Sequence, residues 1–149
     1  MREGYRIQVR NNKVSFDVVL EYRITVLTGP SATGKTSLLN LIANFEDYGR
    51  QSGVKLISEK PCYVIRNNIR WYERISGIQE GIIFIQDGLS FIHSCEFAEL
   101  IENSQNYFVI VTREPLAQIH STKDSAIGIR EAKREGNCVY NESYKIHHK

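Results

Sequence analysis

The chain has 149 residues, 42% of them hydrophobic, which fits one globular domain spanning residues 1–149. Its 19 Lys and Arg residues against 17 Asp and Glu residues give a net charge of +2, which favours no particular class of partner. The three cysteines, Cys62, Cys95 and Cys138, form no C-x-x-C pair, which argues against a zinc site or a disulfide framework. The chain begins without a signal-peptide pattern and has no apolar run of membrane-spanning length, so we expect a cytoplasmic protein that does not associate with membranes.

Two segments of alternating hydrophobicity open the chain. Residues 5–10 and 14–20 each place apolar side chains on one face, as half-buried strands do, and Asn11-Asn12 between them is typical of a turn. A third apolar segment, residues 24–27, follows and has the composition of a buried strand. We expect these segments to form a small antiparallel meander.

A phosphate-binding motif comes next. Residues 29–36, GPSATGKT, match the Walker A pattern G-x-x-x-x-G-K-[ST], and the following residues 37–43 have a helical pattern, as the motif requires. Two glycines let the backbone approach a phosphate, the lysine suits the β- and γ-phosphates, and the threonine offers a hydroxyl to Mg²⁺. The predicted nucleotide-binding residues are Gly29, Pro30, Ser31, Ala32, Thr33, Gly34, Lys35, Thr36 and Ser37.

The remaining elements are short. Residues 82–85 and 107–112 are apolar runs typical of central strands buried on both faces, and residues 91–101 have a helical pattern. Residues 54–57 and 62–65 have the pattern of a pair of short strands or a hairpin. After Ala117 the pattern weakens, and we expect strands at residues 125–132 and 137–140.

Asp87 directly follows the predicted central strand 82–85. A nucleotide–magnesium site needs a carboxylate at the end of a neighbouring strand, so Asp87 is a candidate metal ligand together with Thr36, or the group that orients an attacking water. The alternative is that Asp87 simply forms an Asp-Gly turn that closes the strand.

Three features together resemble a P-loop NTPase, and more specifically a reduced ABC-type ATPase core. They are the meander before GPSATGKT, the Walker B-like stretch IIFIQDG, and the stretch FVIVTREP, which resembles the strand that follows Walker B. The resemblance implies an α/β fold: a P-loop NTPase-like sandwich with a mostly parallel central sheet and an N-terminal antiparallel meander. It also implies ATP and Mg²⁺ as cofactors. The Leu-Ser-Gly-Gly-type signature segment is absent and too few residues separate Lys35 from Asp87 for a helical subdomain, which argues against a role in transport.

The resemblance also assigns roles to single residues. Gln86 falls on the usual Mg²⁺-associated aspartate, Asp87 on the catalytic glutamate and Arg113 on the switch histidine; a shift by one residue would make Asp87 the metal-site aspartate instead. Neither Gln86 nor Arg113 accepts a proton, but Arg113 is a candidate to stabilise γ-phosphate charge, with an ordinary surface arginine as the alternative. Tyr5 is a candidate to stack on adenine, with packing within a strand as the alternative.

Basic residues are frequent towards the C-terminal end. They fit either a lid over the phosphates or a nucleic-acid surface, or else a solvated face, and the sequence places no aromatic platform among them. They are Arg113, Lys123, Arg130, Lys133 and Arg134.

Three functions follow from these features. The first is a small cytoplasmic ATP-binding P-loop protein with slow or partner-dependent ATPase activity, since one of the expected acidic groups is missing. The second is a small-molecule or nucleotide kinase, and the third is a regulatory module that binds nucleotide without hydrolysing it. We expect a protein partner or a homodimer, and nucleic acid is a partner that the sequence leaves open but does not support.

Overall fold

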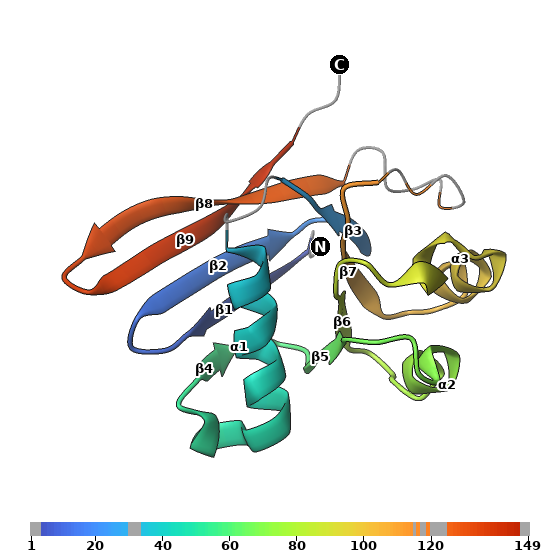
Figure 1. The fold of residues 1–149 in the computed structure, drawn as a ribbon, viewed down its shortest axis with the longest axis horizontal. Helices are drawn as coiled ribbons and strands as arrows, with labels where there is room; N and C mark the ends of the chain where they lie inside the picture. The colour runs from blue at the N-terminus through green and yellow to red at the C-terminus, as the bar shows by residue number, and fades with distance from the viewer. Residues whose placement is uncertain (1–3, 30–33, 115, 117–118, 120–124, 147–149) are drawn as a thin grey trace.

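The computed structural model describes residues 4–29, 34–114, 116, 119 and 125–146 (Figure 1). This part of the chain forms nine strands, three α-helices and two short 3-10 helices. In chain order they are β1 (Tyr5–Arg10), β2 (Val14–Leu20), β3 (Ile24–Leu27), α1 (Lys35–Tyr48), η1 (Gly49–Ser52), β4 (Lys55–Ile57), β5 (Cys62–Ile65), α2 (Trp71–Ser76), β6 (Ile82–Ile85), η2 (Ser90–His93), α3 (Cys95–Glu102), β7 (Tyr107–Val111), β8 (Ala126–Glu135) and β9 (Cys138–Lys145).

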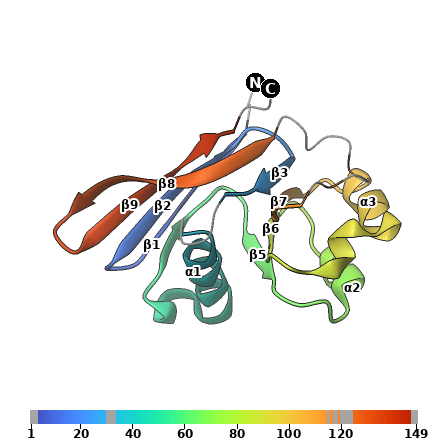
Figure 2. The same cartoon turned by 45° about the horizontal axis from the view of Figure 1, so that its top comes forward.

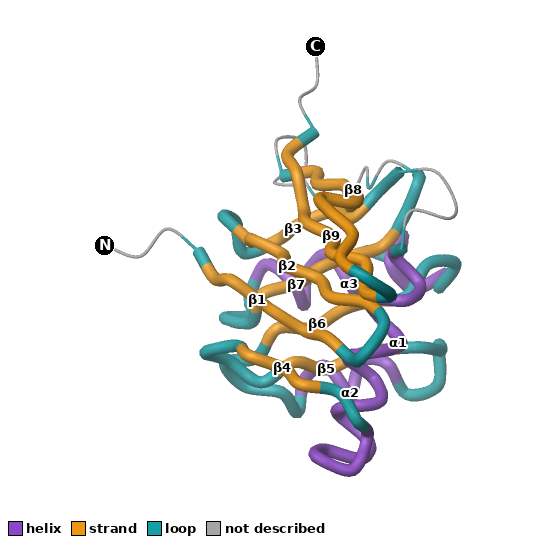
Figure 3. The backbone as a smooth tube through the Cα atoms, turned by 90° about the vertical axis from the view of Figure 1, so that its left-hand side faces the viewer, coloured by secondary structure: helices purple, strands orange, loops and turns teal. Residues whose placement is uncertain are grey.

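All nine strands belong to one mixed sheet with the order β4-β1-β2-β9-β8-β3-β7-β6-β5. The five strands from β8 to β5 run parallel to one another, while β4, β1 and β2 are antiparallel and β8 and β9 form a long antiparallel hairpin. Helix α1 contacts both β4 and β5, which are the two edge strands, so the sheet curls around this helix like half a barrel (Figure 3).

Two apolar clusters hold the elements together. One lies inside the curl, where Leu38 and Ile42 of α1 meet the inward side chains of the strands, including Phe16 and Val109. The other lies where α2 and α3 pack on the opposite face of β6 and β7, and it contains stacked aromatic rings, Trp71 on Phe91 at 4.6 Å between ring centres. Strands β6 and β7 are therefore covered on both faces, as their continuous apolar sequence predicts.

The predicted fold class is wrong. The chain does not form a P-loop NTPase-like sandwich with a mostly parallel central sheet and an N-terminal antiparallel meander. Instead, the β8–β9 hairpin pairs with β3 on one side and with β2 on the other, which joins the N-terminal strands and the parallel strands into a single curled sheet. Helical cover is small, because α2 has six residues and α3 has eight.

Several individual elements agree with the sequence and one pairing does not. The strands expected at residues 5–10, 14–20, 24–27, 62–65 and 82–85 are all present. The alternative of a hairpin between residues 54–57 and 62–65 is wrong, because β4 pairs with β1 and β5 pairs with β6, at opposite edges of the sheet. The helix expected over residues 91–101 is divided into η2 and α3 at Ser94, whose hydroxyl accepts a hydrogen bond from the Phe97 N–H at 3.1 Å.

Candidate functional site

The carboxyl ends of the parallel strands β3, β7 and β6 lie side by side, and we call this end of the strands the carboxyl edge of the sheet. Leu27 is aligned with Val111, and Ile85 with Ile110, in parallel register. The residues that follow these strands must therefore emerge side by side, and the Thr112 N–H indeed donates to the Leu27 carbonyl at 3.2 Å. In this way the fold brings the start of the phosphate-binding motif to the same edge as the segments that follow β6 and β7.

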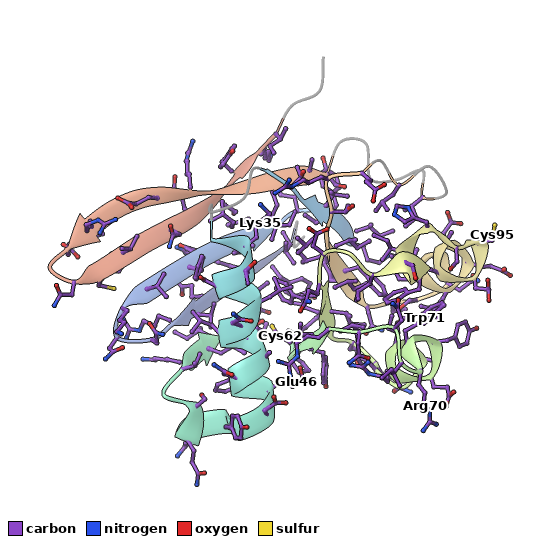
Figure 4. All side chains as sticks on the ribbon, viewed as in Figure 1. Lys35, Glu46, Cys62, Arg70, Trp71 and Cys95 are labelled. Atoms are coloured by element: carbon purple, nitrogen blue, oxygen red, sulfur yellow. The ribbon has the colours of Figure 1, made fainter. Side chains whose placement is uncertain are left out.

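The phosphate-binding motif is described at both ends. Pro30, Ser31, Ala32 and Thr33 lie outside the described residues. Gly34 precedes α1 with a φ of 100°, and its carbonyl accepts the first helical hydrogen bond from the Leu38 N–H at 2.9 Å. Lys35 is the first residue of the helix, and its ammonium donates to the Gly29 carbonyl at 2.8 Å, which brings the two ends of the loop together (Figure 4).

Helix α1 points its amino-terminal end at this loop. The helix has 14 residues, no acidic residue in its first turn and no side-chain cap at Gly34. Thr36 and Ser37 are exposed on that first turn. The N–H groups of the first turn have no partner within a helix, and the helix dipole adds positive partial charge, so this end suits an anionic ligand.

The charges of two residues that follow neighbouring strands influence the pKa of Lys35. Burial lowers the pKa of the Lys35 ammonium, the positive charge of Arg113 lowers it further, and the negative charge of Asp87 opposes both. Arg113 follows β7, Asp87 follows β6, and both side chains are exposed. The structure therefore brings Lys35, Asp87 and Arg113 together, and Gln86 lies beside Asp87 with its N–H donating to the Ile65 carbonyl at 3.0 Å.

Mg²⁺ at nucleotide sites is usually bound by one or two protein oxygens together with phosphate oxygens and waters. The described residues contain no group of three or more His, Cys, Asp or Glu arranged to hold a metal by themselves. The exposed Thr36 hydroxyl at the start of α1 and the exposed Asp87 carboxylate fit the smaller number of protein ligands that a nucleotide-bound Mg²⁺ requires.

Tyr5 is not brought to this site. Its ring packs edge-on against Tyr107 with 4.8 Å between ring centres, and the Lys60 ammonium lies 5.3 Å from its centre. Tyr107 is the first residue of β7, whereas the site lies beyond the last, Val111. The contact with Tyr107 fits the alternative of packing between strands. It lies at the amino-terminal end of β7, whereas the site lies at the carboxyl end.

Three of the basic residues near the C-terminal end, Arg130, Lys133 and Arg134, lie in the β8–β9 hairpin. Lys123 lies outside the described residues, and Arg130 and Lys133 belong to β8, which is paired along its length with β9. Arg130 bonds to Glu142 at 2.8 Å, and Arg134 bonds to Glu131 at 3.0 Å. These residues are therefore fixed in a hairpin.

One neighbour of the loop was not evident from its sequence. A Cβ atom at Gly34 would stand 3.2 Å from the Phe16 ring of β2 and 3.8 Å from Ile129 of β8. The alternating pattern of residues 14–20 predicts that Phe16 is buried, but nothing local to it indicates a contact with the motif. Only the pairing of distant strands places it there.

The sequence was also compared with known proteins. No family model matches the chain. Over 108 residues, 72% of this chain, it is 29% identical to ABC transporter G family member 5 of Dictyostelium discoideum. The chain spans only 7% of that transporter's length. This similarity points weakly to an ABC-like nucleotide-binding region. No helix among the described residues combines the length and apolar character needed to cross a membrane.

Proposed function

We propose that the chain is a P-loop protein that binds ATP with Mg²⁺ and hydrolyses it slowly or only with a partner. The observation that carries the proposal is the position of Lys35. It stands at the amino-terminal end of α1, its ammonium reaches back to the Gly29 carbonyl, and the charges of Asp87 and Arg113 act on it. The similarity to an ABC transporter supports nucleotide as the ligand.

The residues at this edge have complementary chemistry towards a triphosphate. Backbone N–H groups of the loop and of the first turn of α1 would bind phosphate oxygens, and Lys35 would add a positive charge at the β- and γ-phosphates. Thr36 and Asp87 would hold Mg²⁺. A bound triphosphate would offset the repulsion between Lys35 and Arg113. Arg113 would also stabilise charge that develops on the γ-phosphate.

The proposal predicts slow turnover for a chemical reason. Asp87 is the single acidic side chain directly after β6, and its neighbour Gln86 can orient a water by hydrogen bonding but cannot remove its proton. If Asp87 holds the metal, no second carboxylate from this segment activates the water. A protein partner or a second copy of the chain would supply the missing group, and without one the protein would bind ATP and retain it, which is the alternative function of a regulatory module.

A nucleotide titration tests the binding part of the proposal. Lys35→Ala removes a charged hydrogen-bond donor worth about 1.5–3 kcal/mol, so ATP affinity should fall by about 10- to 100-fold in a fluorescent-nucleotide titration with Mg²⁺. Arg50→Ala is the matched control, because it removes the same charge just beyond the other end of α1 and should leave affinity unchanged. Asp87→Asn should remove the Mg²⁺ dependence of binding. Equal affinity of the Lys35→Ala variant and the unmodified protein would contradict the proposal.

A further inference from the structure

Five strands of the sheet have a face that no described helix covers. These are β4, β1, β2, β9 and β8 (Figure 2). Inward side chains of β1, β2, β4 and β8 belong to the apolar cluster that includes α1. We call the opposite side of these five strands the outer face. Its side chains alternate with the inward ones, so β1 buries Ile7 and Val9 and presents Arg6, Gln8 and Arg10 outward.

The register of the strands lines up one row of side chains straight across the outer face. Arg10 is paired with Lys55 and with Ser15, Ser15 with Tyr140, and Tyr140 with Lys133. Four spacings between neighbouring strands make this row about 19 Å long. The row therefore contains three cations and one aromatic ring but, among these five positions, no carboxylate.

The neighbouring row supplies acids but pairs them. Asp17 accepts hydrogen bonds from Arg6, and Glu142 bonds to Arg130 at 2.8 Å. Lys133 approaches Glu135 at 3.5 Å, but that ion pair is highly exposed and therefore weak. The charge of the first row is left largely uncompensated, and the two rows line a hollow of about 430 Å³.

Aromatic rings lie among these cations. The Lys133 ammonium is 4.9 Å from the centre of the Tyr140 ring, and the Arg130 guanidinium is 5.0 Å from the Tyr144 ring. Tyr144 extends over Gly128, where a Cβ atom would stand 2.7 Å from the ring, so only glycine allows the tyrosine to approach the sheet this closely. Both tyrosines are half-buried and face outward.

We propose that the outer face binds single-stranded nucleic acid, with phosphates on the row from Lys55 to Lys133 and a base stacked on Tyr140. Cations together with outward-facing aromatic rings are the combination that non-specific single-strand binding uses, because every base offers a π-face and every nucleotide a phosphate. An acidic polypeptide would match the cations but would leave the rings without a purpose. A duplex would not offer its stacked bases to Tyr140. The proposal does not depend on nucleotide binding at the phosphate loop.

Fluorescence anisotropy with a labelled single-stranded oligothymidine and with the corresponding RNA tests this. The triple variant Arg10→Gln, Lys55→Gln and Lys133→Gln should bind about 10-fold or more weakly, and the slope of log affinity against log salt should fall by about 2 for the three lost phosphate contacts. The control variant removes three exposed cations away from the outer face: Arg50→Gln, Arg66→Gln and Arg70→Gln. It should keep both the affinity and the slope.

A second variant separates stacking from charge. Tyr140→Leu should weaken binding about 5-fold or more without changing the salt slope, because it removes a stacking surface and no charge. Tyr48→Leu, at an exposed position of α1, is its control, and thermal melting of every variant checks the fold. The proposal is overturned if the unmodified protein does not bind at 50 mM salt (a low ionic strength at which phosphate contacts are strong), if the two triple variants lose affinity equally, or if a duplex binds as tightly. Tighter binding of polyglutamate with no effect of Tyr140→Leu would show an acidic protein as the partner instead.

Discussion

Replacing Gly34 by alanine tests the link between the backbone of the phosphate loop and the core beneath it. Gly34 has a φ of 100°, outside the conformations that an L-residue adopts easily, and such strain costs about 1–3 kcal/mol. The new Cβ would also lie 3.2 Å from the ring of Phe16, which is 1% exposed and cannot move away freely. With about 1 kcal/mol more for this crowding, we expect Gly34→Ala to lower the free energy of unfolding by about 2–4 kcal/mol.

Gly53→Ala is the matched comparison. Gly53 also has a positive φ, 77°, but a Cβ there would meet no atom within 4 Å. Gly53→Ala should therefore lower the free energy of unfolding by about 1–2 kcal/mol, which is the cost of the left-handed conformation alone. Urea unfolding measures both variants, and an ATP titration should show about 10-fold weaker binding for Gly34→Ala only, since a shifted loop no longer aims its N–H groups together. If Gly34→Ala is no less stable than Gly53→Ala, the crowding against Phe16 does not exist in solution.

Three further predictions concern polar or ionisable side chains, two of them buried and one, Glu46, only partly so. Asn106→Ala should lower the free energy of unfolding by about 2–4 kcal/mol in urea, because the buried Asn106 amide bonds two backbone groups ahead of β6 at 2.8 and 2.9 Å; a loss equal to that of the exposed Asn103→Ala would contradict this. Burial raises the pKa of Glu46 above 4.5, so the native state holds this proton more tightly than the unfolded chain and loses stability as the pH rises through the native pKa. Glu46→Gln should therefore melt higher than the unmodified protein at pH 7, and the difference should close as the pH falls below 4.5; equal melting temperatures at pH 7 would refute it. Burial raises the pKa of Cys62 to about 11, so at pH 8 iodoacetamide should label it about 100-fold or more slowly than the exposed Cys95, as peptide mapping by mass spectrometry can measure.

The sequence predicts elements better than it predicts their neighbours. Alternation identified β1 and β2, and continuous apolar runs identified β6 and β7, because these patterns reflect which faces are buried. Pairing depends on the whole chain. The short strands β4 and β5 are close in sequence, and a hairpin between them was one of two alternatives, yet they lie at opposite edges of the sheet with α1 in contact with both.

The wrong fold class has a specific cause. The pattern after Ala117 is weak because most side chains of β8 beyond Ile129 and of β9 are not fully buried, so neither strand shows a clear apolar face. This hairpin nevertheless lies at the centre of the sheet, between β2 and β3. The expectation of a parallel sheet with an antiparallel meander was possible only while the position of the β8–β9 hairpin was unknown.

The candidate site was predictable to the extent that it depends on strand ends. Asp87 and Arg113 each follow an apolar strand, and the parallel register of those strands is enough to bring both near Lys35. Tyr5 begins a strand instead, and its contact with Tyr107 depends on how strands far apart in the chain are arranged, which the residues around Tyr5 do not indicate. Residues that end parallel strands can thus be assigned to one edge from sequence, whereas residues on antiparallel strands cannot.

Strand β8 connects the two surfaces proposed to be functional. Its inward side chains Ile127 and Ile129 lie beside Leu27 and the end of the phosphate loop, while its outward side chains Arg130 and Lys133 belong to the outer face. Side chains of a strand alternate with a period of two, and the β-bulge between Glu131 and Lys133 returns Lys133 to the face that Arg130 occupies. The pairing of Val26 with Ala126 and Leu27 with Ile127 fixes the register of β8 at the loop. The arrangement of cations and tyrosines on the outer face therefore depends on the same backbone pairing that supports the loop.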